Sequence, residues 1–206
     1  MGTRNMVSLY SIGHGNRTID DFVTMLKKYS IEYVIDVRSK PYSRFNPDFS
    51  RGTLDRLLAK TGIRYVYMGD SLGGFPDDPT CYTSEGRVDY DKLKLQDSYK
   101  RGLERLTSAW QQGLNVAIMC SELKPQHCHR SKLIGESLAE ADIPVLHIDE
   151  TGETKNQGQV IDEVKREVLG ASSDQLSLFG DDREFSFTSR KRYTSKRTEG
   201  NLADED

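Results

Sequence analysis

The hydrophobic positions of this chain form short apolar runs that alternate with longer amphipathic segments. Five runs of four to six residues, rich in Val, Ile and Tyr, are typical of buried strands; they cover residues 7–12, 33–37, 63–68, 116–119 and 144–148. The other segments carry apolar side chains three or four positions apart, which predicts helices. The pairs that define these helices are Phe22 and Leu26, Leu54 and Leu58, Leu103 and Leu106, Ile134 and Leu138, and Val160 and Val164.

Strands that alternate with helices in this way imply βαβ units. We therefore expect a three-layer α/β fold, in which helices cover both faces of a mostly parallel, five-stranded sheet. Residues 75–90 show no periodicity and are expected to form a loop. After Gly170 the chain becomes rich in Ser, Asp, Arg and Lys, which predicts a folded domain over residues 1–170 and a disordered tail over 171–206. Within the tail lies a basic patch made of Arg190, Lys191, Arg192, Lys196 and Arg197.

Composition narrows the classes of protein that fit. The formal net charge of −3 excludes a broadly basic protein, so any contact with nucleic acid has to come from a local patch. No apolar run approaches the ~18 residues of a membrane span, and the first residues lack the apolar core of a signal peptide. Three cysteines, two of them close together, do not form a disulfide framework. We expect a cytoplasmic, reducing location and no membrane partner.

The segment after the fourth apolar run concentrates nucleophiles, bases and metal-ligand types. Its reactive side chains are Cys120, Glu122, His127, Cys128, His129 and Arg130. A thiolate forms more readily at a helix N-terminus or beside His and Arg, and free N–H groups at such a terminus bind anions. We expect Cys120, Glu122, Cys128 and His129 to be catalytic, Arg130 to bind phosphate and His127 to be incidental. The two thiols should lie close together, and the sequence leaves open which of them is the nucleophile.

The same cluster permits two other interpretations. Cys120, Glu122, Cys128 and His129 are all of types that bind zinc, although the spacing is not that of a common zinc knuckle and no Cys-x2-Cys pair exists. A divalent metal such as zinc is thus one candidate cofactor. Alternatively, Cys120 is a small buried hydrophobic residue and the histidines are solvated loop residues.

Polar residues also follow the other apolar runs. His14 comes after the first, Asp36 and Arg38 after the second, and Gly73 and Gly74 after the third. Ligands of parallel sheets bind beyond the carboxyl ends of the strands, so these segments should converge on one site. We expect His14 and Asp36 to be catalytic, and Arg38 and the two glycines to bind substrate. In the alternative interpretation, Asp36 pairs with a neighbouring Arg and the glycines only form a turn.

Two further features concern single side chains. The loop after the second run contains Tyr42, Ser43 and Arg44, a set that suits contact with a nucleotide if the Tyr stacks on a base; ordinary loop packing is the alternative. His147 lies inside the apolar fifth run and is expected to be a hydrogen-bonded core residue.

A pentapeptide in the tail, residues 175–179, reads Gln-Leu-Ser-Leu-Phe and resembles the bacterial sliding-clamp-binding motif. A flexible peptide of this kind buries Leu178 and Phe179 in an apolar pocket, while Gln175 and Leu176 complete the contact. The resemblance implies the sliding clamp as a partner, and DNA with it. The alternatives are a chance apolar patch or a segment that docks on its own domain.

Residues 7–168 resemble the DUF488 family of uncharacterised bacterial and archaeal domains. The matching motifs are residues 11–14, Ser-Ile-Gly-His; residues 36–43, with Asp-Val-Arg, Pro and Ser; residues 72–74, Leu-Gly-Gly; and the pair Cys120-x-Glu122 and Cys128-His129-Arg130. The resemblance implies that the functional residues are His14, Asp36, Arg38, Cys120, Glu122, Cys128, His129 and Arg130. It implies no reaction, because the function of the family is unassigned.

The leading hypothesis is a DNA-repair or DNA-processing enzyme that uses a thiolate and a general base on DNA or a nucleotide. One alternative is a non-catalytic metal-binding or nucleic-acid-binding module on the clamp. Another is small-molecule thiol chemistry, such as sulfur transfer, or nucleotide chemistry. Because Cys120 is expected at a strand end and not in the core, its substitution is expected to leave folding nearly intact.

Overall fold

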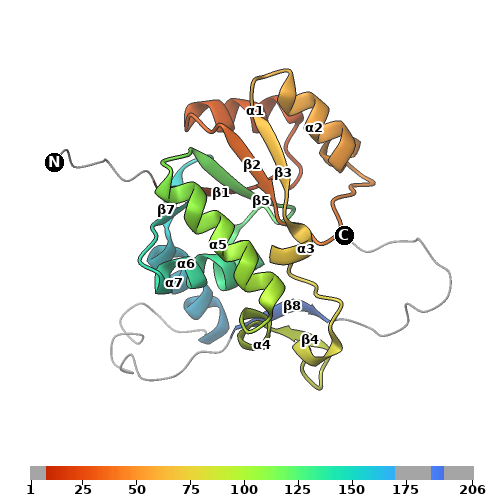
Figure 1. The fold of residues 1–206 in the computed structure, drawn as a ribbon, viewed down its shortest axis with the longest axis vertical. Coiled ribbons are helices and arrows are strands. Elements are labelled where there is room, and N and C mark those ends of the chain that lie inside the picture. The colour runs from red at the N-terminus through yellow and green to blue at the C-terminus, as the bar shows by residue number, and fades with distance from the viewer. Residues whose placement is uncertain (1–7, 170–186, 193–206) are drawn as a thin grey trace.

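A six-stranded sheet forms the centre of the molecule (Figure 1). In this computed structural model, which describes residues 8–169 and 187–192, the strand order is β3-β2-β5-β1-β6-β7. The strands are β1 (Leu9–Gly13), β2 (Tyr33–Asp36), β3 (Arg64–Tyr67), β5 (Val116–Cys120), β6 (Val145–Ile148) and β7 (Thr154–Asn156). The first five of these are mutually parallel and confirm the five predicted strands. β7 adds an antiparallel edge, which its short polar sequence Thr-Lys-Asn did not reveal.

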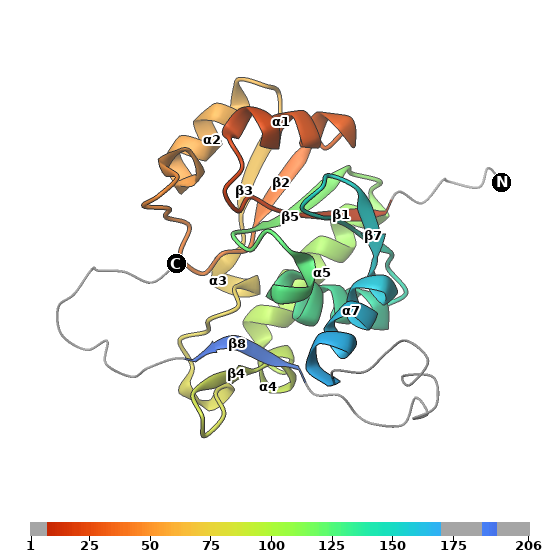
Figure 2. The same ribbon diagram turned by 180° about the vertical axis from the view of Figure 1, so that it is seen from behind.

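Helices cover both faces of the sheet (Figures 1 and 2). They are α1 (Ile19–Lys28), α2 (Arg51–Ala59), α3 (Gly69–Leu72), α4 (Tyr90–Lys94), α5 (Asp97–Gln111), α6 (Glu136–Glu140) and α7 (Gln157–Leu169), with short 3-10 turns at Pro47–Phe49, Pro79–Cys81 and Pro125–His127 and a π-helix at Arg130–Gly135. Within the described ranges, no helix has both the length and the apolar character needed to cross a membrane. The three-layer α/β architecture is therefore as expected.

The core has two halves because consecutive strand residues point to opposite faces. On one face, Val34 of β2 packs with Leu26 of α1 and Leu58 of α2. On the other, Ile35 belongs to a larger cluster that includes Leu106 of α5 and residues of the π-helix and α6. The start of α1 shows the local logic: the Thr18 hydroxyl accepts a hydrogen bond from the Asp21 N–H at 3.1 Å, which satisfies a free donor of the first turn.

The strand order brings the important strand ends together. β5 lies between β1 and β2; after β1 the chain forms β2 and β3 on one side of β5, and after β5 it forms β6 and β7 on the other side. Gly13 is directly opposite Cys120, and Asp36 is opposite Met119. In parallel sheets, such a switch point opens a crevice at the carboxyl ends of the strands. The order thus places the end of β5 between the residues that follow β1 and β2.

A second, two-stranded sheet lies beyond α3 and α4 (Figure 2). β4 (Arg87–Asp89) pairs antiparallel with β8 (Thr188–Arg192), and the Val88 N–H donates to the Ser189 hydroxyl at 2.9 Å. This sheet differs from the sequence expectation in two places, since β4 falls in the expected loop 75–90 and β8 falls in the expected tail. The reason is the separation of 101 residues between Val88 and Ser189, which local composition cannot reveal.

Candidate active site

Cys120, Cys128 and His129 form a compact group at the end of β5. Cys120 is the last residue of the strand, and Cys128 and His129 stand between a 3-10 turn and the π-helix. The Nδ1 atom of His129 lies 3.6 Å from the Cys120 sulfur and 3.8 Å from the Cys128 sulfur. All three atoms lie within 4.8 Å of one another, which confirms that the two thiols are neighbours.

The His129 ring is held in a defined orientation. Its Nε2 atom lies 3.2 Å from the Val37 carbonyl oxygen, so Nε2 must carry the proton that it donates. In the neutral ring, Nδ1 is then unprotonated and faces both sulfurs. Gly74 lies against the same ring: a Cβ atom there would come within 2.9 Å of the His129 Cγ. The close approach gives Gly74 a physical role that the sequence interpretation as a simple turn did not contain.

The two thiols differ in acidity. A hydrogen bond from the Cys128 thiol lowers the pKa of Cys120 well below its usual value, and His129 and Arg130 add to this effect. Burial raises the pKa of Cys128, and the neighbouring Cys120 sulfur raises it further. The electrostatic environment therefore favours a Cys120 thiolate beside a protonated Cys128.

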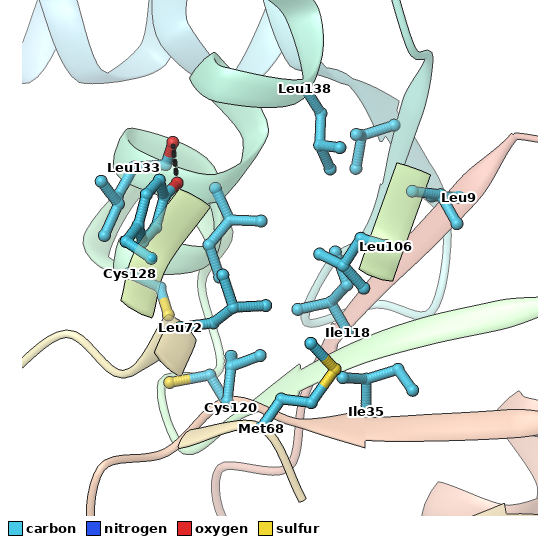
Figure 3. Close-up of a cluster of buried hydrophobic side chains, with 14 of the residues drawn as sticks. Leu9, Ile35, Met68, Leu72, Leu106, Ile118, Cys120, Cys128, Leu133 and Leu138 are labelled. Atoms are coloured by element: carbon cyan, nitrogen blue, oxygen red, sulfur yellow. Dashed lines mark hydrogen bonds between the residues drawn. The ribbon is translucent and has the colours of Figure 1, made fainter. Parts of the chain in front are cut away.

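Both cysteines are part of the hydrophobic core. Figure 3 shows Cys120 and Cys128 in one cluster with Leu72, Ile118 and Leu133. The expected position of Cys120 at a strand end is confirmed, but the expectation that this position lies outside the core was wrong. The physical reason is that α3, α4 and the π-helix cover the end of β5, and both Leu72 and Leu133 are fully buried. A substitution at either cysteine has to be judged for stability as well as for chemistry.

Arg130 holds the loop between the two cysteines. Its side chain is fully buried, and its guanidinium donates to the backbone carbonyls of Glu122 and Leu123, the latter at 3.0 Å. These bonds commit Nη1 and Nη2 to the protein backbone. In this arrangement Arg130 binds the protein backbone, and its contact with phosphate stays a prediction.

The Glu122 side chain is half-buried and lies outside the group of sulfur and imidazole atoms. Among the described residues, the group with metal-ligand spacing consists of Cys120, Cys128 and His129. The expected four-ligand set that included Glu122 is thus not assembled. His127 Nε2 lies 2.9 Å from a carboxylate oxygen of Glu167, so its partner lies outside the group of sulfur and imidazole atoms.

Asp36, Arg38 and His14 form a buried chain beside this group. Arg38 donates to Asp36 through Nε at 2.9 Å and through Nη2 at 2.6 Å, and Nη2 also donates to the Phe49 carbonyl. Its Nη1 lies 3.2 Å from His14 Nε2, and the Tyr65 hydroxyl donates to Asp36 at 2.6 Å. Four of the five N–H groups of Arg38 therefore have protein partners. The pairing of Asp36 with a neighbouring Arg, one of the two sequence alternatives, is what the structure contains.

His14 is a buried, neutral imidazole. Its ring stacks on Phe49 with centroids 4.4 Å apart, and Nδ1 lies 3.0 Å from the Gly15 carbonyl oxygen. Burial and the Arg38 guanidinium lower the pKa of His14 to about 4. His14 Nε2 is thus an unprotonated acceptor at neutral pH. His147, as expected, is a satisfied core residue, bonded to Ser11 and Gln157 at 2.6 Å each.

Stability is expected to fall as the pH drops from about 6.5 to about 4. Burial lowers the pKa of His14 to about 4 and that of His147 to about 3, whereas unfolded histidines titrate near 6.5. In this window the unfolded chain binds protons that the folded chain does not, so acid favours unfolding. The effect of His14 alone is about 3 kcal/mol.

Urea unfolding at a series of pH values measures this effect. His147→Gln should flatten the dependence, and the surface variant His127→Gln should leave it unchanged. A free energy of unfolding that is constant between pH 6.5 and 4.5 would contradict the buried neutral histidines.

The side chains of the loop after β2 differ in their exposure to solvent. Tyr42 is 71% exposed and Arg44 is also exposed, whereas Ser43 is buried and its N–H donates to the Ser50 hydroxyl at 3.2 Å. Tyr42 and Arg44 are therefore accessible to a ligand, and Ser43 supports the loop. Gly73 packs closely against Ser39, where a Cβ would clash with the Ser39 hydroxyl.

Sequence reasoning missed Lys132. Its side chain is only 8% exposed, and among the described residues its ammonium has no hydrogen-bond or ion-pair partner. Burial lowers the pKa of Lys132, and the charges that it senses include those of Cys128, Arg190 of β8 and Glu122. The signal was its position four residues after Cys128, which places both on one face of a helical turn.

Some of the expected residues lie outside the described ranges. They include the pentapeptide 175–179 and, within the basic patch, Lys196 and Arg197. Arg190 and Arg192 of that patch belong to β8 and are exposed.

Comparison with known families assigns the domain. The model of the family described as "Domain of unknown function DUF488" matches residues 18–136, which is more than half of the chain. The chain belongs to the DUF488 family. The matched part of this DUF488 protein contains Asp36, Arg38 and the whole segment from Cys120 to Arg130, and His14 precedes it. No curated protein and no solved structure matches the chain.

Proposed function

We propose that this DUF488 protein is an enzyme that uses the Cys120 thiolate to process DNA or a nucleotide. The orientation of the His129 ring carries the proposal. Its Nε2–H is held by the Val37 carbonyl at 3.2 Å, so that its unprotonated Nδ1 faces both sulfurs. A thiol next to an oriented imidazole is the usual arrangement of an activated cysteine nucleophile.

The proposed division of labour follows from the contacts. His129 Nδ1 takes the proton of the Cys120 thiol, at a separation of 3.6 Å. Cys128 stays protonated and stabilises the thiolate by donating its S–H. His14, neutral at physiological pH, follows the neighbouring strand β1, and its Nε2 accepts a hydrogen bond from Arg38. Arg130 keeps the connecting loop in place.

The assignment to DNA rests on the tail. The peptide 175–179 follows α7 by only a few residues, so a clamp bound to it would hold the domain next to DNA. The exposed Tyr42 and Arg44 and the basic strand β8 suit contact with a nucleic acid. A role in DNA repair or DNA processing brings these features together.

Titration of a labelled peptide of residues 171–184 into purified bacterial sliding clamp tests the recruitment. We expect a micromolar dissociation constant, or about 8 kcal/mol, because a short peptide loses chain entropy when it is ordered. Leu178→Ala and Phe179→Ala should each abolish measurable binding, since buried apolar anchors dominate such contacts. Ser173→Ala, outside the motif, is the matched control. Equal and negligible binding of all four peptides would remove the main support for a role at DNA.

A second candidate is a metal site, because the two sulfur–nitrogen distances fit zinc. Ligands of one tetrahedral zinc ion lie about 3.5–3.8 Å apart, given bond lengths near 2.3 Å to sulfur and 2.1 Å to nitrogen. The distances from His129 Nδ1 to the two sulfurs, 3.6 and 3.8 Å, meet this condition. The Nε2–H bond to Val37 is the outer contact that zinc-bound histidines usually make. When bound with three protein ligands, zinc supplies a Lewis acid for a water or substrate.

Elemental analysis separates the two candidates. One zinc per chain that is lost in Cys128→Ser and kept in Cys81→Ser would favour the metal site, as a catalytic or a purely binding module. Cys81 is a suitable control because it is a free buried cysteine outside the group. A protein without bound metal whose Cys120 reacts at low pH would favour the thiolate enzyme. If that protein also binds neither the clamp nor DNA, small-molecule thiol or sulfur chemistry becomes the leading candidate function.

A further inference from the structure

Exposed aromatic side chains stand on two segments that also contact the candidate active site. In the described part of the chain, the large hydrophobic residues most open to solvent are Tyr42, Phe45, Phe75 and Leu95, at 71, 81, 43 and 69% exposure. Three of these four are aromatic, and these three stand on the segments that follow β2 and α3. Sequence analysis singled out Tyr42 alone. Burying an aromatic side chain is favourable, so this exposure calls for an explanation.

Tyr42 and Phe45 stand on a loop whose backbone is held by hydrogen bonds. The Asn46 N–H donates to the Ser43 hydroxyl at 3.2 Å, and the Asn46 amide donates to the Arg17 carbonyl at 2.8 Å. The Arg51 N–H donates to the Pro41 carbonyl at 2.8 Å. These bonds fix the backbone on both sides of Tyr42 and Phe45. The two rings are therefore presented to solvent by an ordered scaffold.

Both aromatic segments border His129. The first begins at Val37, whose carbonyl holds the His129 ring, and the second contains Gly74, which lies against that ring. The two segments are also joined, because the Phe75 N–H donates to the Ser39 hydroxyl at 3.0 Å. Tyr42, Phe45 and Phe75 therefore stand on two joined segments that each include a residue in contact with His129; we call these three residues the aromatic rim.

The loop that carries Tyr42 and Phe45 has a positive net charge, whereas Asp77 and Asp78 follow Phe75. Residues 39–51 contain the basic side chains Lys40, Arg44 and Arg51 and the acidic side chain Asp48, so three positive charges meet one negative charge, a local excess of two. Lys40 and Arg44 are exposed on the same loop as the rings, and the Arg51 guanidinium lies 4.3 Å from the centre of the Tyr67 ring. Exposed aromatic rings next to basic side chains suit a ligand whose planar rings are linked by negatively charged groups.

We propose that the aromatic rim stacks the unpaired bases of a single-stranded nucleic acid and so leads one nucleotide towards the cysteine–histidine group. The proposal rests on the proposed action on nucleic acid and specifies its substrate as an unpaired strand. Bases stack on exposed aromatic rings whatever their sequence, whereas paired bases of a duplex hide their faces. Lys40 and Arg44 would neutralise the adjacent phosphates, which makes the binding dependent on salt.

Fluorescence anisotropy with the full-length protein tests this. The probe is a labelled oligothymidine of about 12 nucleotides, and the comparison is a duplex of the same length. Tyr42→Ala and Phe45→Ala should each weaken single-strand binding about five- to a hundredfold. Leu95→Ala is the matched control, because Leu95 is equally exposed but lies at the end of α4; it should bind as the wild type does.

Two further variants distinguish base stacking from apolar docking of a protein. Phe45→Trp keeps a flat ring and should retain binding, whereas Phe45→Leu keeps the apolar character without a ring and should lose it. Equal binding by Phe45→Leu and the wild type, or tighter binding of the duplex than of the single strand, would overturn the proposal.

The outcomes also separate this proposal from the proposed function. Cys120→Ser should bind the single strand normally, since Cys120 is not part of the rim. Loss of binding in the rim variants, together with no Cys120-dependent reaction on DNA, would support the rim proposal and contradict the proposed enzyme function. A Cys120-dependent reaction on DNA that is unaffected by Tyr42→Ala and Phe45→Ala would support the proposed enzyme function and contradict the rim proposal.

Discussion

Cys120 is expected to react with iodoacetamide at pH values where an ordinary thiol is almost inert. A thiol with a pKa near 8.5 is only about 1% ionised at pH 6.5, and the thiolate is the reactive form. In this protein, the hydrogen bond from Cys128 lowers the pKa of Cys120, and His129 lowers it further. We expect the pH midpoint of Cys120 labelling to lie well below 8.5.

Mass spectrometry of alkylated peptides over a pH series measures this midpoint. The midpoint is the appropriate quantity because burial slows labelling at every pH, whereas the position of the midpoint reports ionisation. Cys81 is an internal control, since burial raises its pKa. His129→Gln should move the Cys120 midpoint upward by removing the imidazole. Midpoints at or above 8.5 for both Cys120 and Cys128 would exclude the thiolate mechanism.

The same variants separate a chemical role from a structural one. Cys120→Ser places a hydroxyl inside the cluster that contains Leu72 and Ile118, and a buried polar group without a good partner costs about 1–3 kcal/mol. His129→Gln removes a half-buried ring and should cost less. Activity therefore has to be expressed per folded molecule. Variants that unfold but keep full activity in their folded fraction would make the cluster structural.

The convergence of the site was predictable because parallel strands share a carboxyl edge. Asp36 and Cys120 each end a run whose apolar residues identify a buried strand, and both lie at that edge. The strand order was not predictable, since nothing in the sequence says that β5 enters between β1 and β2. That order alone decides that Gly13 faces Cys120. Local pattern therefore identifies the edge, and only tertiary structure identifies the neighbours.

The direction of long side chains is what the sequence could not show at the site. Arg130 and Arg38 look like anion ligands in the sequence, because both follow strand or loop residues near a predicted site. In the structure both guanidiniums bond inward, to the Glu122 backbone and to Asp36. Lys132 shows the opposite case, a lysine that is buried although its charge favours solvent. A sequence pattern gives the position of a charge along the chain but not the partner that it finds.

The buried pair of Asp36 and Arg38 is expected to contribute strongly to the stability of the domain. Asp36→Ala removes the acceptor of three hydrogen bonds from Arg38 and of one from Tyr65. It leaves the Arg38 guanidinium buried without its counter-ion, which typically costs about 3–5 kcal/mol. Urea unfolding should show a loss of that size, a large share of the 5–15 kcal/mol typical of a whole domain.

Two further variants show which partner is responsible. Tyr65→Phe removes one hydrogen bond to the carboxylate and should cost about 1.5–3 kcal/mol. The double variant Asp36→Leu/Arg38→Met should be less destabilised than Asp36→Ala, since apolar side chains in place of both charges leave no buried charge unpaired. If Asp36→Ala instead costs less than 1 kcal/mol yet abolishes activity per folded molecule, then Asp36 acts in catalysis. A large loss of stability that the double variant recovers would make the pair the support that holds His14 beside the cysteine–histidine group.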